Sequence, residues 1–216
     1  MCIQDGTTGV RFSEGKGILW QSQINTAATF NETLMYKIGK AQGAESKEKG
    51  INTLLYPSVN IMKKPQDILW ESFGDDPFYS GVCASKIISG IQESGVIATI
   101  KHFLGNVQEI YEIPNKYNPD INALMDIYVE PFYRAIHEED VRAVMAGNNT
   151  FNGTYCYENE YLLTNILRNY LNFKGFIISD LYDVDNTHNY DCSLLDLYLG
   201  EECNIKDSCL SPLKNV

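Results

Sequence analysis

Short apolar runs alternate along this chain with longer segments whose apolar residues recur every three or four positions. The short runs are rich in aliphatic residues, which predicts buried strands. They lie at residues 51–56, 96–100, 141–145 and 176–179. The longer segments have the period of an amphipathic helix. They lie at residues 25–44, 77–93, 120–139 and 161–171. This order predicts an α/β fold, in which βα units build a parallel sheet that is covered on both faces.

Polar residues follow two of the predicted strands. Lys101 and His102 come after the strand at 96–100, and Asp180 comes after Ser179. Parallel α/β proteins carry their chemistry at the carboxyl ends of the strands, so these residues are candidates for a site. A lysine gives a fixed charge, a histidine a tunable donor, and a carboxylate a nucleophile, a base or a hydroxyl acceptor. Each also has a structural alternative: the histidine as an ordinary loop residue, and the aspartate as a helix cap.

Composition narrows the class of partner. The chain has 216 residues, 17 Lys plus Arg and 28 Asp plus Glu, which gives a net charge of −11. This length favours one large domain. The acidic balance argues against binding nucleic acid and is compatible with a neutral substrate such as a sugar. No apolar stretch is long enough to span a membrane, so no membrane partner is expected. No signal peptide is readable at the start, and the sequence assigns no compartment.

The cysteines and histidines predict no metal or other cofactor. The chain has six cysteines without a C-x-x-C pair and only three histidines, so a zinc site is not expected. Cys203 and Cys209 enclose a short loop and could form a disulfide in an oxidising compartment. The alternative is that all six are buried or free thiols.

Five sequence blocks occur in a fixed order across most of the chain. They are DGTTGVR at 5–11, NTAATFN at 25–31, WESFGDDP at 70–77, GVIATIKHF at 95–103 and FKGFIISD at 173–180. Their order and spacing resemble glycoside hydrolase family 3, and within it the fungal-type β-glucosidases. The resemblance implies a (β/α)8-like, TIM-type barrel. It also implies hydrolysis of terminal β-D-glucosyl residues in a small β-glucoside or oligosaccharide, with retention of anomeric configuration.

The resemblance also assigns roles to individual residues. Asp180 corresponds to the nucleophile that forms a glycosyl-enzyme ester. Asp5, Lys101 and His102 correspond to residues that bind hydroxyl groups of the sugar. Retaining hydrolysis needs a second carboxyl group about 5–5.5 Å from the nucleophile. In fungal-type members this glutamate belongs to the following domain, so the resemblance places no acid/base residue in this chain.

Several positions depart from the family pattern. Ile68 stands where the family has an arginine, Asn148 where it has a tyrosine, and Leu181 where it has a tryptophan. The proline that usually follows Asp-Gly is Thr7. An isoleucine cannot give the two-pronged contact of a guanidinium, and a leucine gives no flat surface for a sugar ring. The alternative function is therefore an inactive relative that at most binds sugar.

The blocks also suggest a division of the chain. Residues 1–191 are interpreted as a partial barrel domain, and residues 192–216 as a divergent tail. Family members have a strand and a helix before the Asp-Gly block, and no clear counterpart of the last barrel strand is found in residues 192–216. We therefore expect an incomplete barrel. Its open edge would expose unpaired backbone groups and apolar surface, which favours self-association.

Overall fold

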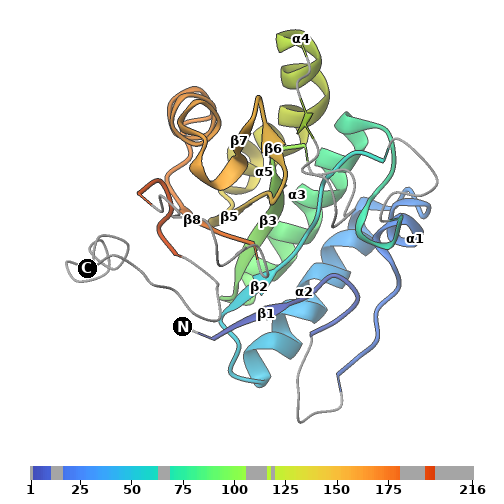
Figure 1. Cartoon of the computed structure of the whole chain (residues 1–216). Helices are drawn as coiled ribbons and strands as arrows, with labels where there is room; N and C mark the ends of the chain where they lie inside the picture. The colour runs from blue at the N-terminus through green and yellow to red at the C-terminus, as the bar shows by residue number, and fades with distance from the viewer. Residues whose placement is uncertain are drawn as a thin grey trace.

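A five-stranded parallel sheet forms the centre of the protein (Figure 1). The structure, a computed structural model, describes residues 2–10, 17–62, 69–105, 116–117, 120–180 and 193–197. The strands are β1 (Ile3–Asp5), β2 (Thr53–Leu55), β3 (Ile97–Phe103), β5 (Ala143–Ala146) and β8 (Phe176–Ile178). They lie in the order β1-β2-β3-β5-β8, and every neighbouring pair is parallel. Across the described residues this sheet does not close, so the α/β barrel fold is present as an open, curved segment.

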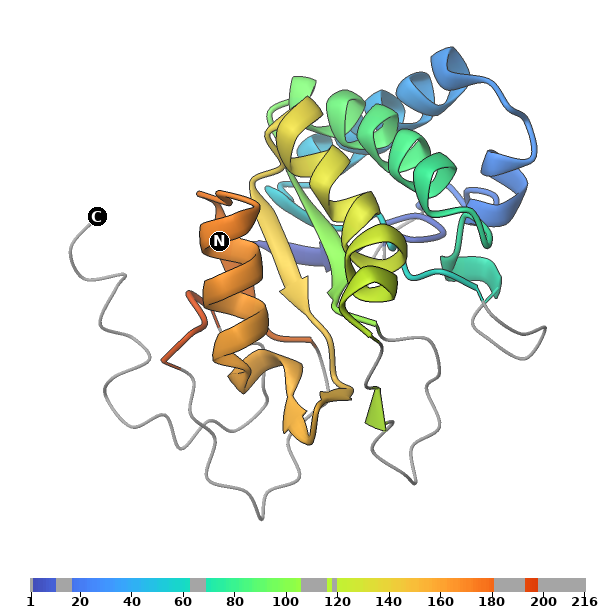
Figure 2. The same ribbon diagram turned by 90° about the horizontal axis from the view of Figure 1, so that it is seen from above.

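Helices connect the strands and pack side by side along one face of the sheet (Figures 1 and 2). They are α1 (Gln23–Ala27), α2 (Glu32–Glu48), α3 (Pro77–Glu93), α4 (Ile121–Ala123), the π-helical η2 (Leu124–Val129), α5 (Glu130–Glu139) and the π-helical η4 (Tyr161–Tyr170). Two short 3-10 helices, η1 and η3, span Leu69–Glu71 and Cys156–Glu158. α4, η2 and α5 follow one another without a break, so the predicted helix at 120–139 is confirmed.

The four predicted strands are confirmed, and β3 is longer than predicted. β3 continues through Lys101 and His102 to Phe103, so both residues lie within a strand and not after it. Its pairing with β5 shifts register between Ile100 and Phe103. The strand β1 was not predicted, because a strand of three residues is too short to show a period.

The prediction of one helix at 25–44 is wrong. Phe30 has a φ of 49°, a left-handed conformation that interrupts the helical path after α1. Asn31 then begins α2 as its N-cap, since its side chain accepts a hydrogen bond from the Leu34 backbone N–H. Asp76 caps α3 in the same way, and Pro77 occupies the first turn, where its missing N–H costs nothing.

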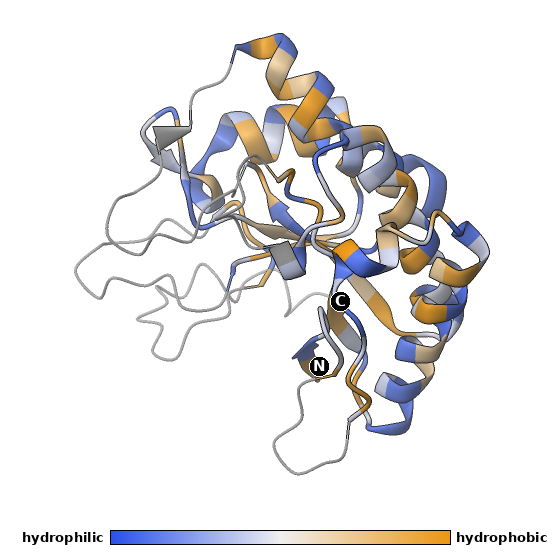
Figure 3. Cartoon of the chain, turned by 90° about the vertical axis from the view of Figure 1, so that its right-hand side faces the viewer, coloured by the Kyte–Doolittle hydropathy of each residue, from blue (hydrophilic) through white to orange (hydrophobic). Residues whose placement is uncertain are grey.

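The main core lies between the sheet and the helices. The helices carry both apolar and polar residues along their length (Figure 3), as expected for helices with one buried face. Leu54 of β2, Ile100 of β3 and Ile177 of β8 belong to this core with the buried side chains of α3. Leu55, Met145 and Ile178 form a second, smaller cluster. Side chains alternate between the faces of a strand, so this cluster lies on the face away from the helices.

A small second sheet extends from the carboxyl end of β5. It contains β4 (Lys116–Tyr117), β6 (Thr150–Phe151) and β7 (Thr154–Tyr155), and β6 pairs with β7 in antiparallel orientation. Asn152 and Gly153 join them, both with positive φ, as a two-residue hairpin turn requires.

Some predictions are only partly covered by the described residues. The three described cysteines, Cys2, Cys83 and Cys156, are free thiols, whereas Cys203 and Cys209 lie outside the described residues. The predicted boundary between residues 191 and 192 also lies outside them and stays a prediction. None of the helices in the described ranges is both long and apolar enough to cross a membrane.

Candidate active site

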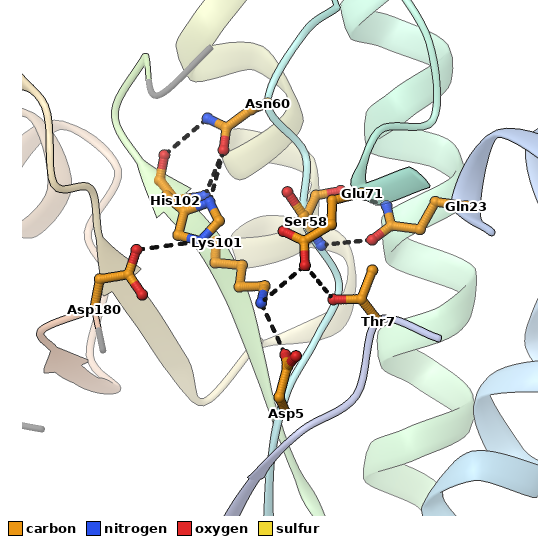
Figure 4. A network of polar contacts seen from close by, with 9 residues as sticks. All are labelled: Asp5, Thr7, Gln23, Ser58, Asn60, Glu71, Lys101, His102 and Asp180. Carbon is orange, nitrogen blue, oxygen red and sulfur yellow. Dashed lines mark hydrogen bonds and ion pairs between the residues drawn. The ribbon is translucent and has the colours of Figure 1, made fainter. Parts of the chain in front are cut away.

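The alternation of side chains along the strands brings three polar residues to one end of the sheet. Asp5 ends β1, Lys101 lies near the end of β3, and Asp180 stands two residues beyond the last residue of β8. Asp180 comes two residues after Ile178, whose side chain lies on the face of the sheet away from the helices. Residues two apart in an extended chain point to the same face, so the Asp180 side chain is directed to that face as well. All three side chains meet at the carboxyl end of the sheet (Figure 4). The prediction that Lys101 and Asp180 lie at this same end is confirmed.

Lys101 lies between two carboxylates. Its Nζ is 2.9 Å from Asp5 Oδ1 and 3.8 Å from Glu71 Oε1, and all three side chains are largely buried. The Thr7 hydroxyl donates a hydrogen bond of 3.0 Å to the same Glu71 oxygen. Burial disfavours the ammonium, but the charges of Asp5 and Glu71 outweigh this effect and raise the pKa of Lys101. The site therefore holds a permanent cation flanked by two anions.

His102 is held by Asn60 and faces Asp180. Its Nδ1 lies 2.9 Å from Asn60 Oδ1, and its Nε2 lies 3.4 Å from Asp180 Oδ2. Burial, together with the positive charge of Lys101, lowers the pKa of the imidazole well below its usual value. The ring is therefore neutral at physiological pH, although Asp180 stands beside it. A neutral imidazole offers one donor and one acceptor.

The segment that supports these residues is the loop after β2. Lys101 N–H donates to the Pro57 carbonyl at 2.9 Å, and Val59 N–H donates to the Lys101 carbonyl at 2.7 Å. The loop thus runs along β3 as an additional backbone partner where β3 departs from regular register with β5. Gln23 of α1 fixes the middle of the loop through two hydrogen bonds with the backbone of Ser58. The peptide bonds Tyr56–Pro57 and Lys101–His102 are cis.

The order of these residues along the chain agrees with a known family over nearly the whole sequence. Residues 1–198 match the family described as "Glycosyl hydrolase family 3 N terminal domain". The chain belongs to glycosyl hydrolase family 3. This finding confirms the family that the five sequence blocks indicated, and the barrel-type α/β fold is that of its members with solved structures.

Relatives of this family 3 chain include fungal and bacterial proteins. It is 41% identical over 188 residues to "Probable beta-glucosidase F" of Aspergillus fumigatus, covering 83% of this chain and 21% of that protein. It is similar to beta-glucosidase 3B of Thermotoga neapolitana in complex with alpha-D-glucose, with 34% identity and a TM-score of 0.81, covering 85% of this chain and 27% of that one. For the beta-D-glucoside glucohydrolase of Trichoderma reesei the identity is 33% and the TM-score 0.84, over 92% and 28% of the chains. This chain therefore spans about a fifth to a quarter of the length of these relatives.

The structure brings together the four residues that the sequence suggested as site candidates, and it adds neighbours that the sequence did not suggest. Asp5, Lys101, His102 and Asp180 are brought together as neighbours of one another. Glu71 lies in one of the five sequence blocks but was not predicted as a site residue, because its block carries no separate signal for a buried charge. Asn60 and Thr7 carry no such signal, because isolated polar residues in loops are common.

Of the three side chains that replace the arginine, tyrosine and tryptophan of the family pattern, the structure describes one, Asn148. Ile68 and Leu181 lie outside the described residues. Asn148 lies just after β5, and its side-chain oxygen is buried without a hydrogen-bond partner among the described residues. The described residues also contain no cluster of three or more His, Cys, Asp or Glu side chains that could hold a metal ion.

The arrangement combines groups that suit a sugar. The carboxylates of Asp5 and Asp180 can accept hydrogen bonds from hydroxyl groups, and the Lys101 ammonium can donate them. Asp180 lies 3.4 Å from the neutral His102, and its charge contributes to the raised pKa of Lys101. An anionic carboxylate beside a hydroxyl-binding cluster can act as a nucleophile toward a bound sugar.

Proposed function

We propose that this chain carries the nucleophile and the glucose-binding groups of a retaining β-glucosidase. The reaction is hydrolysis of the glycosidic bond of a terminal β-D-glucosyl residue in a small β-glucoside or oligosaccharide. The observation that carries this proposal is the meeting of Asp5, Lys101, His102 and Asp180 at one end of the sheet in a family 3 chain. The glucose complex of the Thermotoga neapolitana relative supports glucose as the ligand.

In the proposed reaction Asp180 attacks the anomeric carbon. One carboxylate oxygen forms a bond to that carbon while the bond to the leaving oxygen breaks, and water later hydrolyses the ester. Asp5 and Lys101 hold the sugar hydroxyls, and their ion pair fixes the position of both before the sugar arrives. Asp5 and Glu71 are both engaged by Lys101, so neither suits the role of acid. We propose that the carboxyl group that protonates the leaving oxygen comes from outside the described residues.

Trapping the ester tests this proposal. An aryl 2-fluoro-β-glucoside has a leaving group that departs as a phenolate and needs no proton, so Asp180 alone can form the bond. We expect mass spectrometry of the full chain to show the fluoroglucosyl group on the peptide that contains Asp180. Asp180→Asn should abolish labelling, whereas Asp120→Asn, which keeps the cap of α4, should not alter it. Labelling that persists in the Asp180 variant would exclude this residue as nucleophile.

A second candidate function is sugar binding without hydrolysis. It is favoured by Ile68 and Leu181, which replace the arginine and tryptophan of the family pattern. Loss of those contacts weakens the orientation of the ring and hence the attack by Asp180 more than it weakens binding. Calorimetric titration with glucose separates the two: binding without any labelling of Asp180 supports this second function.

We also propose that the chain associates with itself. The sheet is open across the described residues, and within them β1 pairs only with β2. Unpaired strand edges present backbone donors and acceptors to other chains.

A further inference from the structure

Two carboxamide side chains hold the loop after β2 in the same manner. Gln23 accepts a hydrogen bond from the Ser58 backbone N–H at 3.0 Å and donates to the Ser58 carbonyl at 2.6 Å. Asn60 accepts from the His102 backbone N–H at 3.0 Å and donates to the His102 carbonyl at 3.0 Å. Each amide therefore joins two segments through a pair of backbone hydrogen bonds (Figure 4). Only Asn60 also contacts an ionisable ring.

The backbone contacts determine which way the Asn60 amide points. Oδ1 faces an N–H group and Nδ2 faces a carbonyl, and a flipped amide would set donor against donor and acceptor against acceptor. The atom 2.9 Å from His102 Nδ1 is therefore the oxygen. An amide oxygen only accepts hydrogen bonds, so Nδ1 carries the proton in this contact. In a neutral imidazole the other nitrogen, Nε2, is then an acceptor.

We propose that Asn60 is a positioning residue that fixes the proton of the neutral His102 ring on Nδ1, so that Nε2 serves as a hydrogen-bond acceptor for a sugar hydroxyl. The part of this inference that concerns the sugar rests on the proposed function. The part that concerns the ring stands on the contacts of Asn60 and on the burial of His102. Asn60 acts through His102 and need not touch the substrate.

This tautomer determines which hydroxyl orientation the site accepts. His102 Nε2 lies 3.4 Å from Asp180 Oδ2, and both atoms accept hydrogen bonds when the ring is neutral and Asp180 is ionised. A hydroxyl at this position must therefore direct its hydrogen to one of them and cannot receive one from the ring. Lys101, the adjacent cation, has the opposite preference, because an ammonium group only donates. A bound sugar would therefore meet a hydrogen-bond donor, the Lys101 ammonium, and an acceptor, His102 Nε2, on consecutive residues of β3.

Nitrogen-15 NMR of the full chain labelled at histidine tests the positioning role directly. The expected spectrum of His102 has a protonated Nδ1 and an unprotonated Nε2 near neutral pH. Asn60→Asp keeps an oxygen acceptor and should keep the proton on Nδ1. Asn60→Leu removes the acceptor, and the proton should redistribute toward Nε2. Gln23→Leu removes two equivalent backbone hydrogen bonds from the same loop and should leave the His102 spectrum unchanged.

Glucose titration, followed by the same His102 signals, separates the two proposals. We expect glucose to shift Nε2 and the affinity to fall about 3- to 10-fold in Asn60→Leu but not in Gln23→Leu, as for the loss of one hydrogen bond. A protonated Nε2 in the unaltered chain overturns the role of Asn60, whether or not Asn60→Leu folds. A protonated Nδ1 with no response to glucose instead retains the tautomer and counts against the proposed function.

Discussion

Lys101 joins two carboxylates that are both largely buried. Its partners are Asp5 and Glu71, whose side chains expose only 13% and 10% of their surface. Removing one partner of a buried ion pair leaves an unpaired charge, and the protein either unfolds or takes up a proton. The ion pair therefore serves the stability of the sheet end as well as the proposed sugar contacts.

Replacement of this lysine tests that view. We expect Lys101→Met to lower the free energy of unfolding by about 3–5 kcal/mol, measured by urea denaturation. Lys40→Met is the matched control, since Lys40 forms a 2.7 Å ion pair with Glu93 in which both side chains are about half exposed. Such surface pairs contribute about 0–1 kcal/mol. Equal effects of the two substitutions would show that the buried pair carries no special weight.

The lowered pKa of His102 predicts a dependence of stability on pH. In the unfolded chain this histidine takes up a proton at the ordinary imidazole pKa of about 6.5, whereas in the folded chain it does so only at a lower pH. Acidification below that value therefore favours unfolding, and stability is fully retained above it. We expect this residue to contribute a slope of up to ~1.4 kcal/mol per pH unit between pH ~6.5 and ~5.

Denaturation curves at several pH values in this window measure the effect. His102→Gln should flatten the pH dependence, whereas substitution of the exposed His137 by glutamine serves as the control for removal of a histidine. A slope that is unchanged in His102→Gln would mean that the folded ring takes up its proton as readily as the unfolded one.

Site residues that follow a recognisable strand could be predicted from the sequence. Site residues in loops could not, because their contacts depend on how the loop folds. Asp180 was predictable because a parallel strand determines where its next residues point. Asn60 was not, because its role depends on contacts with a residue 42 positions away that only the folded chain creates.

The helices α2 and α3 pack at a distance that only glycine permits. A Cβ atom at Gly39 would lie 2.2 Å from the Ile87 carbonyl oxygen, and one at Gly90 would lie 2.2 Å from the Tyr36 carbonyl oxygen. Both obstacles are backbone atoms, so the helices would have to separate. This contact explains why two glycines, which are poor helix formers, occur within these helices.

Alanine at position 39 measures the cost of separating the helices. Helix propensity alone predicts a gain of about 1 kcal/mol for Gly39→Ala. We expect instead a net loss of about 2 kcal/mol, because overpacking outweighs propensity. Ala44→Gly, at an exposed position of α2, gives the propensity contribution in the same helix. A more stable Gly39→Ala protein, observed by thermal denaturation, would show that the two helices move apart at little cost.

Periodicity predicted the strands and helices but not every boundary. The long helices α3 and η4 follow from their apolar stripes. The break between α1 and α2 does not, since it depends on the left-handed conformation of Phe30, which an apolar aromatic residue rarely adopts. β3 extends past its apolar run because the loop after β2 supplies additional backbone partners.

For the molecule as a whole, we expect self-association to depend on protein concentration. Sedimentation velocity should show species heavier than the 24.4 kDa monomer as the concentration rises. Edge-to-edge pairing buries backbone groups that the open sheet otherwise leaves to water. A monomer at all concentrations, with a sharp and reversible unfolding transition that concentration does not shift, would contradict the proposal.

The ion pair between Lys101 and Asp5 spans 96 residues of sequence, and Asp180 joins the same cluster from the far edge of the sheet. The cluster therefore exists only after strands from both ends of the described chain have docked. Contacts of such long sequence separation form slowly, so partly assembled chains persist during synthesis. A sugar that binds the cluster recognises only fully assembled molecules and stabilises them by about 2.7 kcal/mol at a hundredfold excess over its Kd. Under the proposed function, glucose or an analogue that resists hydrolysis would thus act on this protein as a chemical chaperone.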